Sequence, residues 1–282
     1  MSLPLRFQLF ATCLIGTLGG IVLTGITRAT VYEPPAHSDP GVVKGNEPVT
    51  ERDPARAMIY QGQGIKLVSA GKLEAGLDQF RRAAAYDPGN LNILVNISYV
   101  LDKLGRYEEA IDQLKEAEKI GPRNSMIYLN WGNSLINMRK YEEALEPLQK
   151  AADIDPSNQL VYVNLGAALN NLKRYKEAAS NFEKAVELDP KNVSLNFNLA
   201  TVWSNLGETA KAAKEYERVI ELDPKNLTAY FNCAALYEKT GNLDGAISTI
   251  RAAIRVDPDN GTLREILSRL LVEKANRVPP SQ

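Results

Sequence analysis

The chain has 282 residues, with 33 basic against 34 acidic side chains and a formal net charge of −1. This balance leaves no basic footprint for nucleic acid, so we expect no nucleic-acid partner. The single histidine, His37, and the two cysteines, Cys13 and Cys233, lie far apart in the sequence. They do not form a metal-spaced set, and we expect no metal, no cofactor and no intrachain disulfide.

The first predicted element is an apolar segment at residues 9–26, which carries no charge over 18 positions. As a helix this segment would be about 27 Å long, close to the ~30 Å hydrocarbon core of a bilayer. One interpretation is a single-pass membrane anchor within residues 1–29. The other is a signal peptide that is cleaved on export, for which the apolar run is long. The flanking basic residues favour an anchored chain whose remainder lies on the outer face, periplasmic or lumenal.

Residues 30–56 are rich in proline and poor in large apolar side chains. Such a composition is typical of a semi-extended chain that does not build a packed core. We therefore predict a flexible tether over 30–56, which holds the rest of the protein near the bilayer.

From residue 57 onward the sequence repeats with a period of 34 residues, which predicts stacked structural units. Small residues recur at the eighth, twentieth and twenty-seventh positions of each unit, and a large apolar residue recurs at the twenty-fourth. The units are 57–90, 91–124, 125–158, 159–192, 193–226 and 227–260. The periodic prolines are Pro88, Pro122, Pro156, Pro190, Pro224 and Pro258.

Each unit is predicted to be a pair of antiparallel helices. Apolar residues recur at intervals of three and four, which is typical of a helix with one buried stripe. A polar turn such as Lys173-Arg174 separates the two stripes, and Asp-Pro closes the second helix. The small residues let the backbones of facing helices approach closely.

This 34-residue pattern over 57–260 resembles the tetratricopeptide repeat. The resemblance implies an all-α fold, a right-handed superhelical solenoid of antiparallel helix pairs whose first helices line a concave groove. After the last unit we predict a capping helix at 261–277, which begins with a capping box at Thr262–Glu265. Its apolar face is predicted to contain Ile266, Leu267, Leu270 and Leu271, and residues 278–282 are predicted to be a disordered tail.

The resemblance also implies that positions 2, 5, 6, 9 and 13 of each unit face the groove. Asparagine, which offers two donors and an acceptor to a peptide backbone, recurs at positions 6 and 13. The predicted peptide-binding residues are Asn96, Asn130, Asn164, Asn198, Asn232, Asn137, Asn171 and Asn205, with Val163, Phe197 and Phe231 beside them. An apolar column at position 5, formed by Val95, Leu129, Val163, Phe197 and Phe231, is either an exposed patch or part of the core.

The sequence predicts no catalytic site. The acidic pairs Glu108-Glu109 and Glu142-Glu143 fall where second helices begin, where acidic side chains complement the helix dipole. No histidine in the repeats can activate a serine, so we expect no enzymatic activity.

We expect a non-catalytic interaction scaffold, tethered to a membrane, that binds a neutral and partly apolar segment of a partner protein in the groove. Its role is expected in assembly of a membrane or envelope complex. An acidic chaperone terminus is not an expected partner, because Gln61, Ile65 and Asn96 stand where chaperone-binding members carry Lys or Arg. The alternative is a structural subunit that acts through its convex face or by self-association. The sequence leaves the partner, the organism, the compartment and the oligomeric state open.

Overall fold

The computed structural model describes residues 51–277, in which all regular structure is α-helical. By contact the described chain divides into two compact units. The N-terminal unit contains the described residues up to Ala168, and the C-terminal unit begins at Leu169, so the boundary falls inside one helix. The predicted anchor or signal segment at 1–29, most of the predicted tether and the tail at 278–282 lie outside the described residues.

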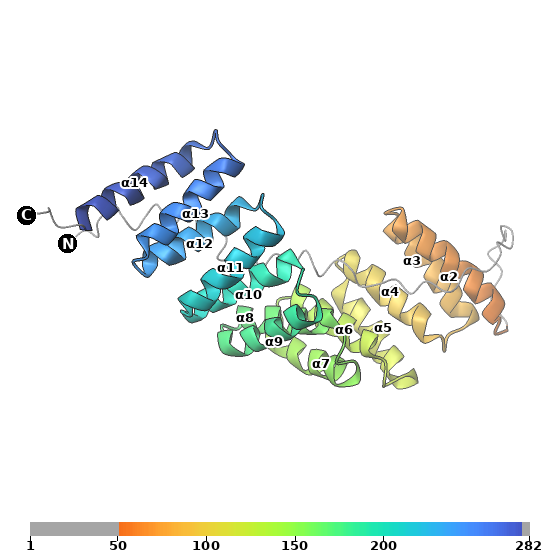
Figure 1. The fold of residues 1–282 in the computed structure, drawn as a ribbon. Helices are drawn as coiled ribbons and strands as arrows, with labels where there is room; N and C mark the ends of the chain where they lie inside the picture. The colour runs from red at the N-terminus through yellow and green to blue at the C-terminus, as the bar shows by residue number, and fades with distance from the viewer. Residues whose placement is uncertain (1–50, 278–282) are drawn as a thin grey trace, which may run out of the picture. The chain divides into compact units, whose positions relative to one another are not determined.

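Thirteen helices follow one another in the described range, consistent with six helix pairs and one further helix (Figure 1). The first helices of the pairs are α2 (Pro54–Ser69), α4 (Leu91–Lys103), α6 (Ser125–Asn137), α8 (Gln159–Asn171), α10 (Val193–Leu206) and α12 (Leu227–Lys239). The second helices are α3 (Leu73–Tyr86), α5 (Tyr107–Ile120), α7 (Tyr141–Ile154), α9 (Tyr175–Leu188), α11 (Thr209–Leu222) and α13 (Leu243–Val256). The last helix is α14 (Gly261–Arg277).

Within each unit, neighbouring helices pack through the small and large apolar positions of the repeat. The twenty-fourth positions include Phe80, Leu114, Leu148, Phe182 and Ile250, all fully buried, and the alanines at the twenty-seventh position are buried with them. The eighth position lies directly opposite the twenty-fourth: a Cβ added to Gly132 would lie 2.6 Å from Cδ2 of Leu148. The prediction that small residues permit close helix approach is confirmed here.

The turn between the two helices of a pair places one residue in the left-handed region in all six repeats. Glycine occupies this fifteenth position in four of them, at Gly71, Gly105, Gly207 and Gly241, with φ between 76° and 85°. Arg139 and Lys173 adopt φ of 60° in the other two repeats. A side chain costs about 1–2 kcal/mol in this region, so the turn geometry is imposed by the packing of the helices on either side.

Four of the first helices are capped by an asparagine that the sequence analysis did not single out. It is the last residue of the preceding repeat, and its Oδ1 accepts a hydrogen bond from a backbone N–H in the first turn of the helix. The lengths of these bonds are 2.9 Å from Met126 to Asn124, 3.1 Å from Leu160 to Asn158, 3.3 Å from Leu195 to Asn192 and 3.1 Å from Ala229 to Asn226.

The first helix begins at Pro54, three residues before the predicted start of the repeats at residue 57. Asp53 caps it by accepting a hydrogen bond of 3.0 Å from the backbone N–H of Arg56, and Pro54 occupies the first turn, where its missing N–H costs nothing. The predicted tether over 30–56 is therefore three residues too long at its C-terminal end.

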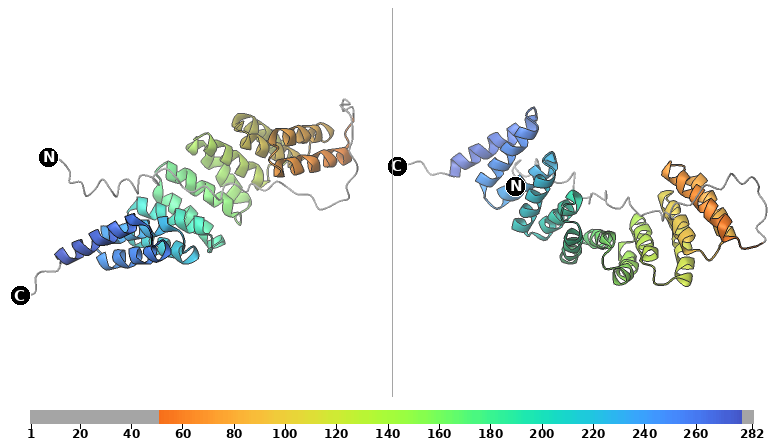
Figure 2. Two further views of the ribbon diagram at one scale, coloured as in Figure 1. Left: turned by 90° about the horizontal axis from the view of Figure 1, so that it is seen from above. Right: turned by 45° about the vertical axis from the view of Figure 1, so that its right-hand side comes forward.

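The final helix, α14, packs on α13, as Figures 1 and 2 show. The predicted capping box is wrong, because Asn260 and not Thr262 caps this helix, accepting a bond of 3.3 Å from the N–H of Leu263. The predicted apolar face is also shifted. Leu263 and Leu270 are fully buried, whereas Leu271 is 40% exposed, because Leu263, Ile266, Leu267 and Leu270 form the stripe that faces α13.

Candidate functional site

The asparagine ladder at position 6 lies inside the helix packing and not on an open surface. Asn96, Asn130, Asn164 and Asn198 are between 1% and 6% exposed, and Asn232 is half-buried. Contact between these side chains and a peptide stays a prediction.

Several of these amides have an atom without a hydrogen-bond partner. Among the described residues, six buried side-chain atoms lack a partner, and five of them belong to first helices. All five occupy positions 5, 6 or 9 of the repeat, which are positions that the resemblance places in the groove. They are Gln61 Nε2, Asn96 Nδ2, Asn133 Oδ1, Asn164 Oδ1 and Asn198 Oδ1. An unpaired buried amide atom costs about 1–3 kcal/mol, so the first helices hold unused hydrogen-bonding capacity.

The asparagines predicted at position 13 are exposed at the ends of first helices. Asn205 donates a hydrogen bond of 3.4 Å to Asn170, and Asn171 lies in the same turn region of the C-terminal unit. Asn137 donates to both carboxylate oxygens of Asp102, at 3.1 and 3.0 Å.

The apolar column at position 5 belongs mostly to the core. Val95, Leu129, Val163 and Phe197 are between 2% and 7% exposed, and only Phe231 is half-buried. The question that the sequence left open is therefore answered: at four of its five positions the column is not a solvent-exposed patch.

Asp102, which the sequence analysis did not single out as part of a site, is the centre of a polar cluster in the N-terminal unit. It lies on α4 and is 8% exposed. Oδ1 accepts from the hydroxyl of Ser134 at 2.9 Å and Oδ2 from Nδ2 of Asn133 at 3.2 Å, in addition to the bonds from Asn137. All three donors lie on α6, 31–35 residues onward, so the cluster joins the first helices of two successive repeats. That spacing of about one period is the signal by which the sequence could have shown it.

Among the described residues, no cation compensates the buried carboxylate through an ion pair. Burial raises the pKa of Asp102 above its ordinary value, and hydrogen bonds from Ser134 and Asn137 and the charge of Lys103 oppose this only in part. Lys103 instead lies over the ring of Tyr99, 5.5 Å from its centroid. Burial, and secondly the Asp102 charge, raise the pKa of Tyr99.

Replacement of Asp102 by Asn is expected to change how stability depends on pH. Because the folded pKa of Asp102 lies above the unfolded value of about 3.9, the group contributes its full stabilisation below that value and loses it as pH rises through the folded pKa. The free energy of unfolding of the wild type should therefore rise relative to that of Asp102→Asn as pH falls from about 7 to about 4. Urea unfolding at several pH values measures this difference, with the exposed Asp112→Asn as control. A difference that does not change with pH would contradict the assignment.

The other groups with chemical potential have structural environments. Glu108 and Glu109 lie in the first turn of α5, and Glu142 and Glu143 in that of α7, as predicted from the helix dipole. Cys233 is fully buried, and burial raises the pKa of its thiol to about 12, so it is protonated at neutral pH. Over residues 51–277 there is no cluster of three His, Cys, Asp or Glu side chains able to hold a metal ion. Within the same range no helix is long and apolar enough to cross a bilayer.

Helix pairs repeat every 34 residues, each with one turn residue of positive φ and with small residues between the packed helices. This arrangement defines a helical-repeat solenoid. Tetratricopeptide repeat profiles match residues 67–128 and 206–270, residues 127–158, residues 160–192 and residues 181–214. The chain belongs to the tetratricopeptide repeat family. It is a non-catalytic scaffold of the kind that binds protein or peptide partners.

Solved structures show the same fold. YrrB, described as a tetratricopeptide repeat protein with an unusual peptide-binding site, is 23% identical over 70% of this chain and 97% of its own, with a TM-score of 0.58. PilF of Pseudomonas aeruginosa is 21% identical over 77% and 97%, with a TM-score of 0.61. MamA of Desulfovibrio magneticus RS-1 is 22% identical over 61% and 97%, with a TM-score of 0.56. No match was found among curated protein sequences.

Proposed function

We propose that this protein is a membrane-tethered scaffold that binds a neutral, partly apolar segment of a partner protein on the faces of its first helices. The partner segment is extended or helical, and the complex that is assembled belongs to a membrane or envelope. The observation that carries the proposal is the location of the unpartnered amide atoms: five of the six lie on first helices, at positions that the resemblance assigns to the groove. The unusual peptide-binding site described for YrrB, a protein of the same fold, supports it.

The burial of these atoms has a consequence for the binding mode. Asn96 and Asn164 are at most 3% exposed, so a partner reaches their amides only by displacing a covering side chain. Half-buried side chains at the predicted groove positions 2 and 9, such as Met126 and Tyr99, are the groups that a partner contacts first. The partner then forms a hydrogen bond with an amide atom that has none in the free protein. Such a bond contributes more to binding than one that only replaces a hydrogen bond to water.

Photocrosslinking in intact cells tests the site. The full chain carries p-benzoylphenylalanine in place of Tyr99 on α4 or, as a matched control, in place of the half-buried Tyr107 on the second helix of the same repeat. We expect a partner adduct from the first position and not from the second. Asn164→Ala should lower the adduct yield with little effect on stability, since Oδ1 of Asn164 has no partner to lose. Equal adducts from both positions, or an adduct that Asn164→Ala leaves unchanged, would remove the first helices from the proposal.

The membrane tether is proposed from the sequence alone, on the 18 uncharged positions of residues 9–26. Carbonate extraction of membranes and the intact mass of the mature protein test it. An anchored chain remains in the pellet with its leader, whereas an exported chain is released and has lost about the first 29 residues. Protease treatment of sealed cells or vesicles then shows whether the repeats face outward, as the proposal has it.

A further inference from the structure

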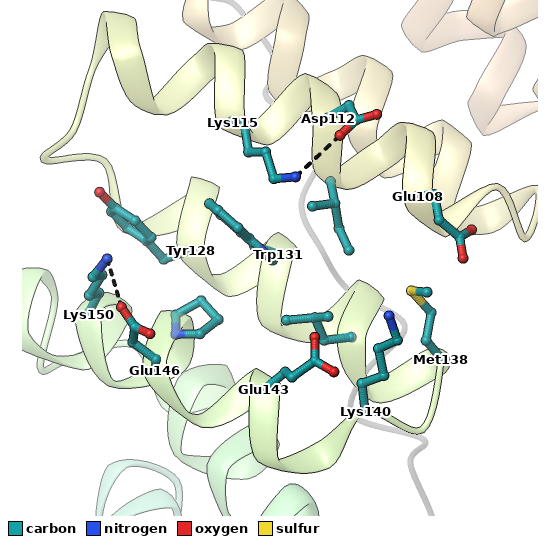
Figure 3. Close-up of a pocket in the computed structure, with 13 residues that line it drawn as sticks. Glu108, Asp112, Lys115, Tyr128, Trp131, Met138, Lys140, Glu143, Glu146 and Lys150 are labelled. Carbon is teal, nitrogen blue, oxygen red and sulfur yellow. Dashed lines mark hydrogen bonds and ion pairs between the residues drawn. The ribbon is translucent and has the colours of Figure 1, made fainter.

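A pocket of about 490 Å³ lies in the N-terminal unit, between the second helices α5 and α7 and one face of the first helix α6 (Figure 3). The residues of α6 that line it are Tyr128, Trp131 and Leu135, and Met138 directly after the helix continues the same stripe. The asparagines and serine that bind Asp102 occupy a different stripe of the same helix, at 133, 134 and 137. The pocket is therefore separate from the first-helix site.

Two departures from the repeat meet in this pocket. Trp131 occupies position 7, and Pro147, inside α7, occupies position 23. The other repeats carry Gln63, Ile97, Leu165, Leu199 and Cys233 at position 7, and Gln79, Gln113, Asn181, Glu215 and Thr249 at position 23. Neither residue is needed to build a repeat, because five repeats fold without it. Both line the same cavity.

The indole of Trp131 is half-buried and has no polar or aromatic partner among the described residues. Several other aromatic rings in the described chain have a cation over the ring. Lys211 lies 4.0 Å from the ring centroid of Trp203, and Lys150 lies 5.6 Å from that of Tyr128. Tryptophan is the strongest cation–π acceptor among the side chains, and the ring of Trp131 remains uncovered.

In Figure 3 the carboxylates of α5 and those of α7 lie on opposite sides of α6, with Glu108 toward Met138 and Glu143 toward Lys140. Two of the four in the lining are neutralised within their own helix: Asp112 pairs with Lys115 at 3.4 Å, and Glu146 with Lys150 at 3.2 Å. Glu108 on α5 and Glu143 on α7 are exposed and form no ion pair within residues 51–277.

The backbone adds a further acceptor. Pro147 has no N–H, so the carbonyl of Glu143, four residues earlier, cannot receive its usual helical hydrogen bond. Lys140 is the one lining cation without an ion pair among the described residues, and the lining as a whole has four acidic against three basic side chains. The pocket therefore offers an aromatic face and an excess of acceptors.

We propose that this pocket receives an arginine side chain presented by a partner protein. The guanidinium stacks on the indole of Trp131, and the unpaired carboxylates of Glu108 on α5 and Glu143 on α7 balance its charge from within the same pocket. Arginine fits better than lysine because its planar group is weakly hydrated, stacks on aromatic faces and carries five donors. Arginine and tryptophan are also the residue types that most often dominate binding at protein interfaces.

Tryptophan fluorescence of the full-length protein tests the proposal. The chain contains two tryptophans, so Trp203→Phe leaves Trp131 as the sole emitter. Titration with N-acetyl-arginine amide should give a saturable change in emission with a Kd on the order of a millimolar, as expected for a ligand of this size. N-acetyl-citrulline amide, which is neutral and nearly the same shape, should bind about tenfold more weakly.

Variants of the pocket provide the controls. The double substitution Glu108→Gln and Glu143→Gln should raise the Kd for the arginine amide about tenfold, and Lys140→Gln should lower it by removing a like charge. Trp131→Phe, which leaves the buried Trp203 as sole emitter, should show no saturable response. Circular dichroism verifies that each variant is folded. Equal binding of citrulline and arginine amides, an unchanged Kd in the double variant, or no saturable response from Trp131 would overturn the proposal.

Discussion

Phe197→Ala is expected to lower the free energy of unfolding by about 3–5 kcal/mol, the range for removal of a buried aromatic side chain. Phe197 is 7% exposed and packs edge-on against Tyr216, with ring centroids 5.4 Å apart. The hydroxyl of Thr201 lies 3.1 Å from that of Tyr216 and also bonds the carbonyl of Phe197, at 2.9 Å. The alanine variant therefore loses apolar contacts and loosens a hydrogen-bonded cluster.

Phe231→Ala is the matched control, because it removes the same side chain from the same position of the next repeat. Phe231 is half-buried, so its loss should cost about 2 kcal/mol or less. Urea unfolding followed by circular dichroism measures both variants. Equal losses would show that the burial of Phe197 does not determine its contribution, and would reopen the position-5 column as a binding surface.

The helices of this protein follow from its sequence because a 34-residue period fixes many positions together. Five of the six second helices are followed directly by the Asp of an Asp-Pro pair, as at Asp155 and Asp189. The turn residue has positive φ in every repeat, even where the side chain is Arg139 or Lys173. The residue type alone does not predict positive φ at an arginine, whereas the 34-residue period of the surrounding sequence does.

The depth of each side chain was harder to predict than its direction. Helical period indicates which side of a helix a residue occupies, but the exposure of positions 5 and 6 depends on how closely the next first helix approaches. The cluster at Asp102 shows such an approach, since its three donors come from the following first helix. A pattern within one repeat contains no information about this contact between repeats.

The same limit applies at the ends of the repeat array, where one neighbour is missing. Leu263 joins the apolar face of α14 because it packs on α13, and Leu271 is excluded from that face by the same geometry. Asn260 caps α14 as the last residue of the sixth repeat, by the bond that preceding repeats use. The capping prediction was wrong because it followed the local motif at Thr262, although the 34-residue frame was the stronger signal.

Gly132→Ala and Gly62→Ala are expected to change stability in opposite directions, although both replace a glycine inside a first helix. A Cβ at Gly132 would lie 2.6 Å from Cδ2 of Leu148 and closer still to Cγ. Leu148 is fully buried, and the clash involves its branch point Cγ and not only the ends of the side chain. The overpacking should cost about 1–3 kcal/mol, more than the gain of up to ~1 kcal/mol in helix propensity.

At Gly62 a Cβ would meet nothing within 4 Å. Alanine there should raise the free energy of unfolding by about 0.5–1 kcal/mol, because it restricts the unfolded chain and introduces no clash. Urea midpoints of the two variants provide the comparison. Ser98 and Leu114 occupy the equivalent positions of the second repeat, where a side chain is already accommodated between α4 and α5. A neutral Gly132→Ala would mean that α6 and α7 accommodate the added Cβ without cost, and the close approach at Gly132 would then not be a source of stability.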